Sequence, residues 1–581
     1  MALQKLNLFQ TLRPHEAAAA LRTEEYHRQK LETLRARLNG APRDRGAYIE
    51  LARFHIRLQQ LESAILVLQE GIARCEPSDQ LYSEAIFALE EANRTEEATA
   101  LAHRASELFP EVSYFRLWEA LMLPVLYQTE KQIEHYRLHF VAGLKTVIAE
   151  LKLDTPKNRL AALRAIEKHV NFYLGYQGYN DREVQEEYGR FLHRIVAANY
   201  PEWAESLQMP PTDPGGRIRV GYITAHFRDH SVSKLFLGWL SEHDREDFEV
   251  FTYHNGHSVD VLTDKVRQAS DHFRHMPGEF KGLCRAIRGD NLHVAVFLDV
   301  RHRRMAMASS LRLAPVQCVA WAHPITSGSP NLDYYLSSEL MEPENGQDHY
   351  SERLIRLPGI GVNYPKPIIP RPLLGKRRAD FGLREDRLLF LCCQSSFKYL
   401  PQDDDLFARI AKRIPASQFV FLALNDVIAK ILLQRLQSAF AEEGLDAADY
   451  CVLLPQLALF DYWNLNLLSD VFLDSLHWSG GVTTLEAIAC GLPIVTLPGR
   501  FMRGRHTYGI LMQLGVTELI AHDKDSYVEI AVRLGTDGEW RAQILERMSA
   551  GHSRLYGDSR CVRVLEDFYR SVVNGRISVK P

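Results

Sequence analysis

Short apolar runs alternate with helix-like stretches over the C-terminal part of the chain, and no other feature constrains the fold as strongly. The first set of runs is RIRVGYI (217–223), FEVFTYH (248–254), HVAVFLDV (293–300) and QCVAWAH (317–323). A second set begins near residue 387 with RLLFLCC and continues with QFVFLAL (418–424), YCVLLP (450–455), DVFLDS (470–475) and PIVTLP (493–498). Buried strands that alternate with helices form parallel sheets. The sequence therefore predicts two consecutive Rossmann-like domains, 216–375 and 380–581, with ligands bound in the cleft between them.

The N-terminal part has a different pattern, because its apolar spacing is helical from about residue 45 to 145. Two segments align at a period of 33 to 34 residues, which pairs Ala64 with Ala98 and Pro77 with Pro110. A repeat of this length, with small residues where two helices touch and a proline after the second helix, is typical of tetratricopeptide repeats. We therefore expect a helical, tetratricopeptide-like region over 1–145, linking helices over 146–210, and a linker at MPPTDPGG (209–216).

Composition excludes several classes of protein. A formal net charge of -4 gives no basic surface for nucleic acid. No run of about 18 apolar residues is present, so we expect no membrane span and a cytoplasmic location. The eight cysteines form no CxxC pair, and no His/Cys cluster has zinc spacing, so we predict no metal site. The acidic run 403–405 is expected to cap a helix rather than bind a metal.

The stretch DVFLDSLHWSGGVTTLEAIACGLPIVTLPG (470–499) carries the strongest functional pattern. Asp474 stands at the tip of a predicted strand, and the small residues SGG (479–481) lead into TT (483–484) at the start of a helix. Small residues let a phosphate approach the backbone, and threonine hydroxyls and free N–H groups at a helix start bind oxyanions. An acidic residue at a strand tip binds a ribose diol in dinucleotide-binding folds. The alternative is an ordinary turn with a threonine cap.

Three other polar positions follow predicted strands. Lys398, in CCQSSFKYLP (392–401), would place an ammonium in the cleft to neutralise a diphosphate leaving group, unless it is simply a solvated lysine. His230, in GYITAHFRDHSVSKL (221–235), offers a base or a phosphate donor, although it is one of 23 histidines. Backbone donors at TSG (326–328), after a further strand, would meet substrate.

These residues together resemble the protein O-GlcNAc transferase family, glycosyltransferase family 41, which also includes bacterial N-glucosyltransferases and plant SPINDLY-type fucosyltransferases. The motifs that recur in order are RIRVGY…FRDHSVSKL, LRLAPVQCVAWAHPITSGSPNLDYYLSS, HYSERLIRLP, SSFKYLP, DVFLDS…GVTTLEAIACGLPIVTLPG and LGVTELIA. The resemblance implies an α-helical N-terminal region followed by an α/β GT-B fold, whose two Rossmann-like domains face a cleft. It also implies inverting transfer from a nucleotide-sugar co-substrate, with no metal and no further cofactor.

The resemblance assigns roles to matching residues. His230 would be the active-site histidine near the acceptor and the diphosphate, and Lys398 would stabilise the departing UDP. Asp474 would bind the ribose, and Tyr462 would stack on the uracil. Further residues implied on the nucleotide-sugar side are Gln394, Ser395, Gly481, the phosphate-binding pair Thr483 and Thr484, and Arg505. Those implied on the acceptor or sugar side are His293, Thr326, Ser327 and Gly328.

Several motifs differ from those of the animal enzyme. Its His-Thr-Thr reads VTT (482–484) here, its Tyr-Lys reads FK (397–398), and its GYPGTSG reads AHPITSG (322–328). The segment DVRH (299–302) does not preserve the family's Gly-Tyr/His-Thr loop. Nucleotide handling is therefore better supported than the identity of the sugar or the acceptor.

The expected function is transfer of GlcNAc from UDP-GlcNAc to Ser or Thr of polypeptides that the helical repeats recruit. One alternative is a protein N-glucosyltransferase using UDP-glucose on Asn, or an O-fucosyltransferase using GDP-fucose. Another is a non-catalytic repeat scaffold that binds nucleotide, although the joint presence of His230, Lys398 and the two threonines argues against it. The sequence leaves the sugar, the acceptor and self-association into a homo-oligomer open.

Overall fold

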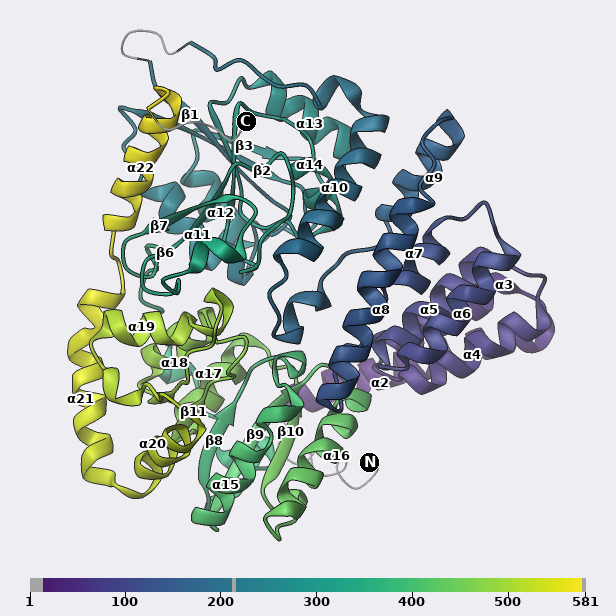
Figure 1. Ribbon diagram of the computed structural model, residues 1–581. Coiled ribbons are helices and arrows are strands. Elements are labelled where there is room, and N and C mark those ends of the chain that lie inside the picture. Colours follow the sequence, from purple (N-terminus) through teal and green to yellow (C-terminus); the bar gives the residue numbers. More distant parts are fainter. Residues whose placement is uncertain (1–13, 212–215, 577–581) are drawn as a thin grey trace.

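The computed structural model describes residues 14–211 and 216–576. A helical N-terminal region is followed by two α/β units, coloured from purple through teal to yellow in Figure 1. The predicted fold class is therefore confirmed. Residues 1–13 of the predicted helical region, 212–215 of the predicted linker and 577–581 of the last unit lie outside the described residues.

The helical region contains the repeat that the sequence predicted. The first helices of two successive pairs begin at Arg45 and Asp79, and Ala64 and Ala98 on the second helices are fully buried. No helix in the described ranges is both long enough and apolar enough to cross a bilayer. The elements up to the first sheet are α2 (Pro14–Gly40), α3 (Arg45–Arg57), α4 (Leu61–Arg74), α5 (Asp79–Glu91), α6 (Thr95–Leu108), α7 (Tyr114–Leu121), α8 (Glu130–Ala149), α9 (Pro156–Ile166), the 3-10 turn η1 (Tyr173–Gln177) and α10 (Arg182–Asn199).

Among the described residues, the first α/β unit forms one parallel sheet of seven strands in the order β3-β2-β1-β4-β5-β6-β7. Its strands are β1 (Ile218–Thr224), β2 (Phe248–His254), β3 (His272–His275), β4 (Val294–Phe297), β5 (Val316–Ala320), β6 (Tyr334–Ser338) and β7 (Arg353–Leu357), and its helices are α11 (Ser231–Ser241), α12 (Val261–Gln268), α13 (Phe280–Gly289) and α14 (Arg303–Ser309). The four predicted runs are β1, β2, β4 and β5. The other strands were missed because β3 and β7 are edge strands with charged residues, and β6 ends in two serines.

The second unit has a parallel sheet in the order β10-β9-β8-β11-β12, and the five predicted runs are its strands. They are β8 (Leu388–Cys392), β9 (Ser417–Ala423), β10 (Cys451–Pro455), β11 (Val471–Leu473) and β12 (Ile494–Val495). The helices are α15 (Asp405–Arg413), α16 (Asp426–Glu442), α17 (Leu459–Leu468), α18 (Val482–Cys490), α19 (His506–Leu514), α20 (Lys524–Thr536), α21 (Gly538–Leu555) and α22 (Arg560–Val573).

The last helix returns to the first unit. In Figure 1 the yellow α22 lies beside the teal sheet, whereas α19 to α21 stay with the second unit. Glu566 on α22 accepts a hydrogen bond from the Asp244 N–H at 2.8 Å, and the hydroxyls of Tyr569 and Tyr222 are 3.4 Å apart. The sequence-based division assigned the C-terminal helix to the second unit, whereas in the structure this helix packs against the first unit.

The acidic run does not cap α15 as expected. Asp404 occupies the N-cap position, yet in this fully described segment its side chain makes no capping bond. Instead its buried carboxylate accepts from Arg435 Nε at 2.6 Å and Nη2 at 3.0 Å. Arg435 also donates to the Tyr127 carbonyl oxygen at 2.7 Å. The capping prediction was wrong for Asp404, because this carboxylate is buried and pairs with a cation that joins the second unit to the helical region. Asp405, however, lies in the first turn of α15, where a carboxylate compensates the helix dipole.

Three parts of the chain meet at the Asp181 carboxylate, just before α10. It lies 2.7 Å from Arg137 of α8 and 3.2 Å from Arg503 of the 3-10 turn η9 (Met502–Gly504) in the second unit. The Asp181 side chain is 1% exposed and that of Arg503 is 4% exposed. Removal of one member of a buried ion pair leaves an uncompensated charge.

We expect Asp181→Asn to destabilise the protein by about 3–5 kcal/mol, because two buried guanidinium groups lose their counter-charge. The measurement is the urea midpoint followed by circular dichroism. Asp567→Asn is the control, since that carboxylate is 74% exposed and pairs with Arg570 on the surface. It should barely move the midpoint. Equal shifts for both variants would contradict the structural role of Asp181.

Candidate functional site

Asp474 organises the loop at the carboxyl end of β11. Its Oδ2 accepts from Ser479 Oγ at 2.6 Å and from Thr496 Oγ1 at 2.8 Å, and its Oδ1 accepts from the Gly480 N–H at 2.8 Å. The residue is 3% exposed, and burial raises the pKa of its carboxyl against the effect of these donors. The carboxylate is thus occupied by the protein itself, and it fixes the turn that leads into α18.

Gly480 brings three side chains close together. A Cβ at this position would lie 2.5 Å from Thr484 Oγ1, 2.7 Å from Gln394 Nε2 and 2.8 Å from Thr483 Oγ1. Only glycine therefore permits this arrangement without displacing those groups. Thr484 is buried and donates to the Gly480 carbonyl oxygen at 3.0 Å, whereas Thr483 is partly exposed.

The N-terminus of α18 is open to an anion. Gly481 occupies its N-cap position and, among the residues described, no side chain caps the helix. The first-turn N–H groups of a helix lack partners within it and carry the positive end of the helix dipole. An anion placed beside Thr483 would therefore meet N–H donors.

Lys398 joins this loop through a chain of hydrogen bonds. Its Nζ donates to Gln394 Oε1 at 2.7 Å, and Gln394 Nε2 donates to Thr483 Oγ1 at 2.8 Å. Burial lowers the pKa of Lys398 to about 8, although the nearby Asp474 charge acts in the opposite direction. The ammonium of Lys398, the amide of Gln394 and the N-terminus of α18 are thus brought together by these hydrogen bonds.

The other residues expected on the nucleotide-sugar side make separate contacts. Tyr462 on α17 is buried, with its hydroxyl 3.4 Å from the Thr483 carbonyl oxygen, so it lies beneath the loop. Ser395 is partly exposed, and its carbonyl oxygen accepts from the Lys398 N–H at 2.9 Å. Arg505 donates through Nε to the Met341 carbonyl oxygen of the first unit at 3.1 Å. Its guanidinium therefore connects the two units.

His230 lies across the cleft, at the N-cap of α11. Its Nδ1 accepts from the Val232 N–H at 3.2 Å, and its ring stacks on that of His226 with centroids 4.2 Å apart. Burial, followed by the neighbouring His226 ring, lowers the pKa of His230 to about 4. Lys234 of α11 pairs with Glu486 of α18 at 3.0 Å. The first turns of the two helices therefore face each other, which brings His230 to the same cleft as the anion site.

His293 lies elsewhere, and its predicted place on the acceptor side is wrong. It immediately precedes β4, so it stands at the amino end of the parallel sheet, whereas His230 follows the carboxyl end of β1. Its Nδ1 accepts from the Arg219 N–H at 2.9 Å, and the residue is fully buried. The prediction rested on the position of His293 near a family active-site histidine in the sequence, and a position in the sequence does not show at which end of the strand a residue lies.

The segment TSG (326–328) makes hydrogen bonds and close contacts with other parts of the protein. Thr326 Oγ1 donates to Glu352 Oε2 at 2.6 Å, and the Ser327 N–H donates to Glu352 Oε1 at 2.9 Å. Gly328 has φ +70°, and a Cβ there would lie 1.8 Å from the Gln185 carbonyl oxygen of α10. These residues therefore hold the loop after β5 against α10 rather than offering free donors to substrate.

Sequence reasoning missed an aromatic wedge between the units. The Tyr176 ring of η1 stacks on Trp478 at 3.9 Å and lies 4.5 Å from Phe397, next to Lys398. His323 of the first unit lies 4.9 Å from Trp478. The signal was present in the aromatic-rich stretch NFYLGYQGY (171–179), which was interpreted only as part of the linking helices. Glu486 was also missed, although it stands one turn into the helix that the threonines begin.

The described parts of the chain contain no group of three or more His, Cys, Asp or Glu side chains arranged to hold a metal ion. Charged side chains near the loop before α18 include Lys398, Lys234 and Glu486.

Comparison with known proteins gives this arrangement a family. The model of glycosyl transferase family 41 matches residues 163–360 and 367–557. A Solanum lycopersicum protein named "Probable UDP-N-acetylglucosamine--peptide N-acetylglucosaminyltransferase SPINDLY" is 26% identical over 433 residues, which are 72% of this chain and 44% of that protein. An Arabidopsis thaliana protein of the same enzyme name, SEC, is 24% identical over 410 residues, 68% of this chain and 41% of that protein. The chain thus spans less than half the length of these curated relatives.

The fold also matches a solved structure, that of a mutant of the Thermobaculum terrenum O-GlcNAc transferase. The TM-score is 0.65 at 24% identity, and the match covers 91% of this chain and 97% of that chain. The helical region and the two α/β units thus share the overall fold of that protein.

We expect Lys398 to titrate with an apparent pKa of about 8, because burial penalises its ammonium form. NMR of a reductively ¹³C-methylated sample measures this value, with the resonance assigned by its loss in Lys398→Met. Asp474→Asn should lower the pKa further, since an attractive negative charge is removed. Titration near the ordinary lysine value of about 10.4 would refute the placement of this side chain.

Proposed function

The chain belongs to glycosyltransferase family 41, and on that premise we propose that it transfers a sugar from a UDP-linked donor to a polypeptide side chain. The observation that carries the proposal is the hydrogen-bonded chain from Lys398 through Gln394 to Thr483 beside the open N-terminus of α18. Cations and N–H donors held in place bind a diphosphate and stabilise charge that develops on it. This group of donors suits UDP as a leaving group.

The proposed reaction is a single displacement with inversion. An acceptor hydroxyl oxygen attacks C1 of the sugar as the bond between C1 and the phosphate oxygen breaks; the bonding electrons leave with UDP, and the hydroxyl proton passes to an oxygen of the departing diphosphate. The added negative charge falls on the diphosphate, where Lys398 and the α18 N–H groups are already oriented. Preorganised donors of this kind lower the barrier because they need no reorganisation during the reaction.

We propose that His230 acts as a hydrogen-bond donor to substrate rather than as a general base. Its pKa of about 4 keeps the imidazole neutral at neutral pH. Because Nδ1 accepts from the Val232 N–H, the single ring proton is on Nε2. We infer that this N–H serves as a donor to an oxygen of the acceptor or the diphosphate. The buried Asp474 carboxylate, in turn, is proposed to position the phosphate loop rather than to hold the ribose.

For the sugar and the acceptor we propose GlcNAc from UDP-GlcNAc and the hydroxyl of Ser or Thr. The printed enzyme names of the SPINDLY and SEC relatives give UDP-N-acetylglucosamine as the donor and a peptide as the acceptor, which supports GlcNAc as the sugar. Incubation with UDP-GlcNAc, UDP-glucose and GDP-fucose in cell lysate, followed by mass spectrometry of the labelled proteins, tests both the donor and the linkage. Labelling from another donor alone, or on asparagine, would overturn this assignment. The cytoplasmic location and self-association stay predictions from the sequence.

We also propose that the helical region presents polypeptide acceptors to the cleft. Its packing supports this role, because the Asp181 ion pairs and the bond from Arg435 to the Tyr127 carbonyl oxygen fix it against the second unit. Helical repeats of this kind form extended surfaces for binding polypeptides.

We predict that Lys398→Ala lowers kcat by about 10²–10³, or roughly 2.7–4 kcal/mol, because a preorganised donor to the leaving group is lost. The Tm should stay nearly unchanged. Lys412→Ala is the matched control, since Lys412 is 60% exposed and pairs with Glu443 on the surface. Retention of more than about a tenth of wild-type kcat, equal to about 1.4 kcal/mol, would remove Lys398 from the mechanism.

We predict that UDP binding and sugar transfer persist in EDTA, because the charge-balancing groups proposed here are a lysine and a helix N-terminus. Isothermal titration of UDP and steady-state rates with and without added magnesium provide the measurement. Loss of UDP binding in EDTA, restored by magnesium, would show that the mechanism needs a metal.

A further inference from the structure

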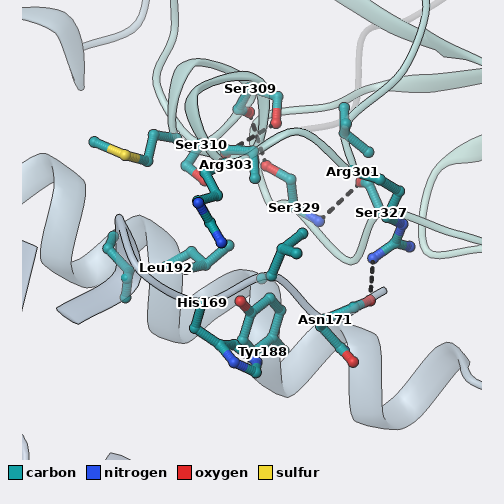
Figure 2. A pocket seen from close by; sticks show the side chains of 16 residues that line it. His169, Asn171, Tyr188, Leu192, Arg301, Arg303, Ser309, Ser310, Ser327 and Ser329 are labelled. Carbon is teal, nitrogen blue, oxygen red and sulfur yellow. Dashed lines mark hydrogen bonds between the residues drawn. The ribbon is translucent and has the colours of Figure 1, made fainter. Parts of the chain in front are cut away.

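A cavity of about 190 Å³ lies where α5, α7, the segment 168–173 and α14 meet. Most of its wall is apolar or aromatic, and two carboxylates also line it, as the full set shows: Ile86, Phe87, Glu90, Glu91, Trp118, Leu121, Met122, Leu123, Lys168, His169, Val170, Asn171, Phe172, Tyr173 and Arg303. A smaller cavity of about 20 Å³, shown in Figure 2, adjoins it. His169, Asn171 and Arg303 line both.

The two carboxylates stand where a cation is favoured. Glu90 and Glu91 end α5, so they lie at the negative end of the helix dipole, and the last turn of this fully described helix has no basic residue. Within the described residues neither side chain has a hydrogen bond or an ion pair. Burial and the charge of Glu91 raise the pKa of Glu90 to about 7, although Arg303 acts in the opposite direction. Burial also raises the pKa of Glu91. Ionising such a pair costs free energy, and a cationic ligand between the carboxylates would offset that cost.

A second observation points to a ligand that donates hydrogen bonds. Asn171 is 2% exposed and lines both cavities, and its Oδ1 has no hydrogen-bond partner in the described part of the chain. Its backbone is fixed, because Arg301 Nη1 donates to its carbonyl oxygen at 3.2 Å (Figure 2). The His169 Nε2 likewise has no partner among the described residues, and burial lowers the pKa of this ring to about 3, so the ring is neutral. Carboxylates and an amide oxygen are acceptors, and a lysine ammonium brings three donors.

The two cations already in the wall do not fill this role. Lys168 and Arg303 form no ion pair with Glu90 or Glu91 in the described structure, and Figure 2 shows the Arg303 side chain extending toward the segment that carries His169. An organic cation suits the cavity, because its alkyl part matches the apolar wall.

Resting on the proposed transferase function, we propose that this cavity is an acceptor subsite that binds a lysine side chain of the polypeptide. The ammonium lies between Glu90 and Glu91, within reach of Asn171. The four-carbon stem packs on Leu121 and Met122, and the rings of Trp118, Phe172 and Tyr173 add cation–π attraction.

The cavity adjoins the candidate active site from both units. Arg303 follows His302, whose ring lies 6.1 Å from that of His226, the stacking partner of His230. On the other side, the Tyr173 ring lies 5.7 Å from Phe397, the neighbour of Lys398. When the acceptor hydroxyl of a polypeptide reaches His230, a residue close to the acceptor in the polypeptide sequence therefore lies near the cavity.

The test uses the full chain and synthetic peptides that carry one serine and one lysine at varied separations. Matched peptides carry norleucine, which keeps the stem and removes the charge. The test variant is Glu90→Gln/Glu91→Gln, and the control Glu76→Gln/Glu111→Gln makes the same charge change at exposed positions. We expect the wild type and the control to show a KM at least tenfold lower for the best lysine peptide than for its norleucine partner. The test variant should lose this difference, with UDP-GlcNAc hydrolysis unchanged within about twofold.

Equal KM values for lysine and norleucine peptides in the wild type, or a preference that survives in Glu90→Gln/Glu91→Gln, would overturn the subsite while leaving the transferase function intact. If no donor is consumed and no peptide is labelled, the transferase proposal fails instead. Fluorescence anisotropy of the labelled lysine peptides, with wild type and variant compared, then decides the subsite without turnover. A purely structural role for the carboxylates would lower the Tm of the variant and leave the peptide preference in place, which would also reject the proposal.

Discussion

The buried Asp181 carboxylate is the interaction on which the geometry of the cleft depends. It holds Arg137 of the helical region and Arg503 of the second unit, and burial of three charged groups is tolerated only because they compensate one another. Arg503 also lies over the Phe501 ring at 4.5 Å, and its own carbonyl oxygen accepts a hydrogen bond from the Ser479 N–H at 2.7 Å. The carboxylate at the start of α10 is therefore connected, through one arginine, to the loop that precedes α18.

The proposed anion site is held in place in a similar way, by buried polar groups that have hydrogen-bond partners. The Asp474 carboxylate accepts hydrogen bonds from the loop, and Gln394 bridges Lys398 and Thr483. Because Gly480 has no side chain, these groups pack closely around it. Donors fixed in this way stabilise a charge without rearranging, which water cannot do. Burial of Lys398 in this arrangement lowers its pKa, and the negative charge of an incoming diphosphate would raise the pKa again.

The sequence predicted most of this fold because buried parallel strands are continuous apolar runs, and all five strands of the second sheet were found that way. It failed where strands were charged or polar, as in β3 and β6. Motif reasoning singled out the residues of the proposed anion site, since a glycine turn before a helix can be recognised from the local sequence. It misplaced His293 and left the wedge residue Tyr176 unnoticed, because edges of a sheet and packing between distant segments are set by tertiary structure.

The helical region shares a hydrophobic core with the two α/β units and is not a separately packed domain. Leu117 of α7 and Phe140 of α8 belong to the core that continues through both α/β units, whereas the helices from α3 to α6 pack mainly around a core of their own. The predicted boundary at residue 145 thus falls inside a shared core. Because α5 ends at the cavity, and the Asn425 side chain of the second unit donates to the Glu91 carbonyl oxygen at 3.1 Å, the repeat core contacts the second α/β unit at this point. The proposed acceptor binding and the proposed chemistry would therefore share one junction.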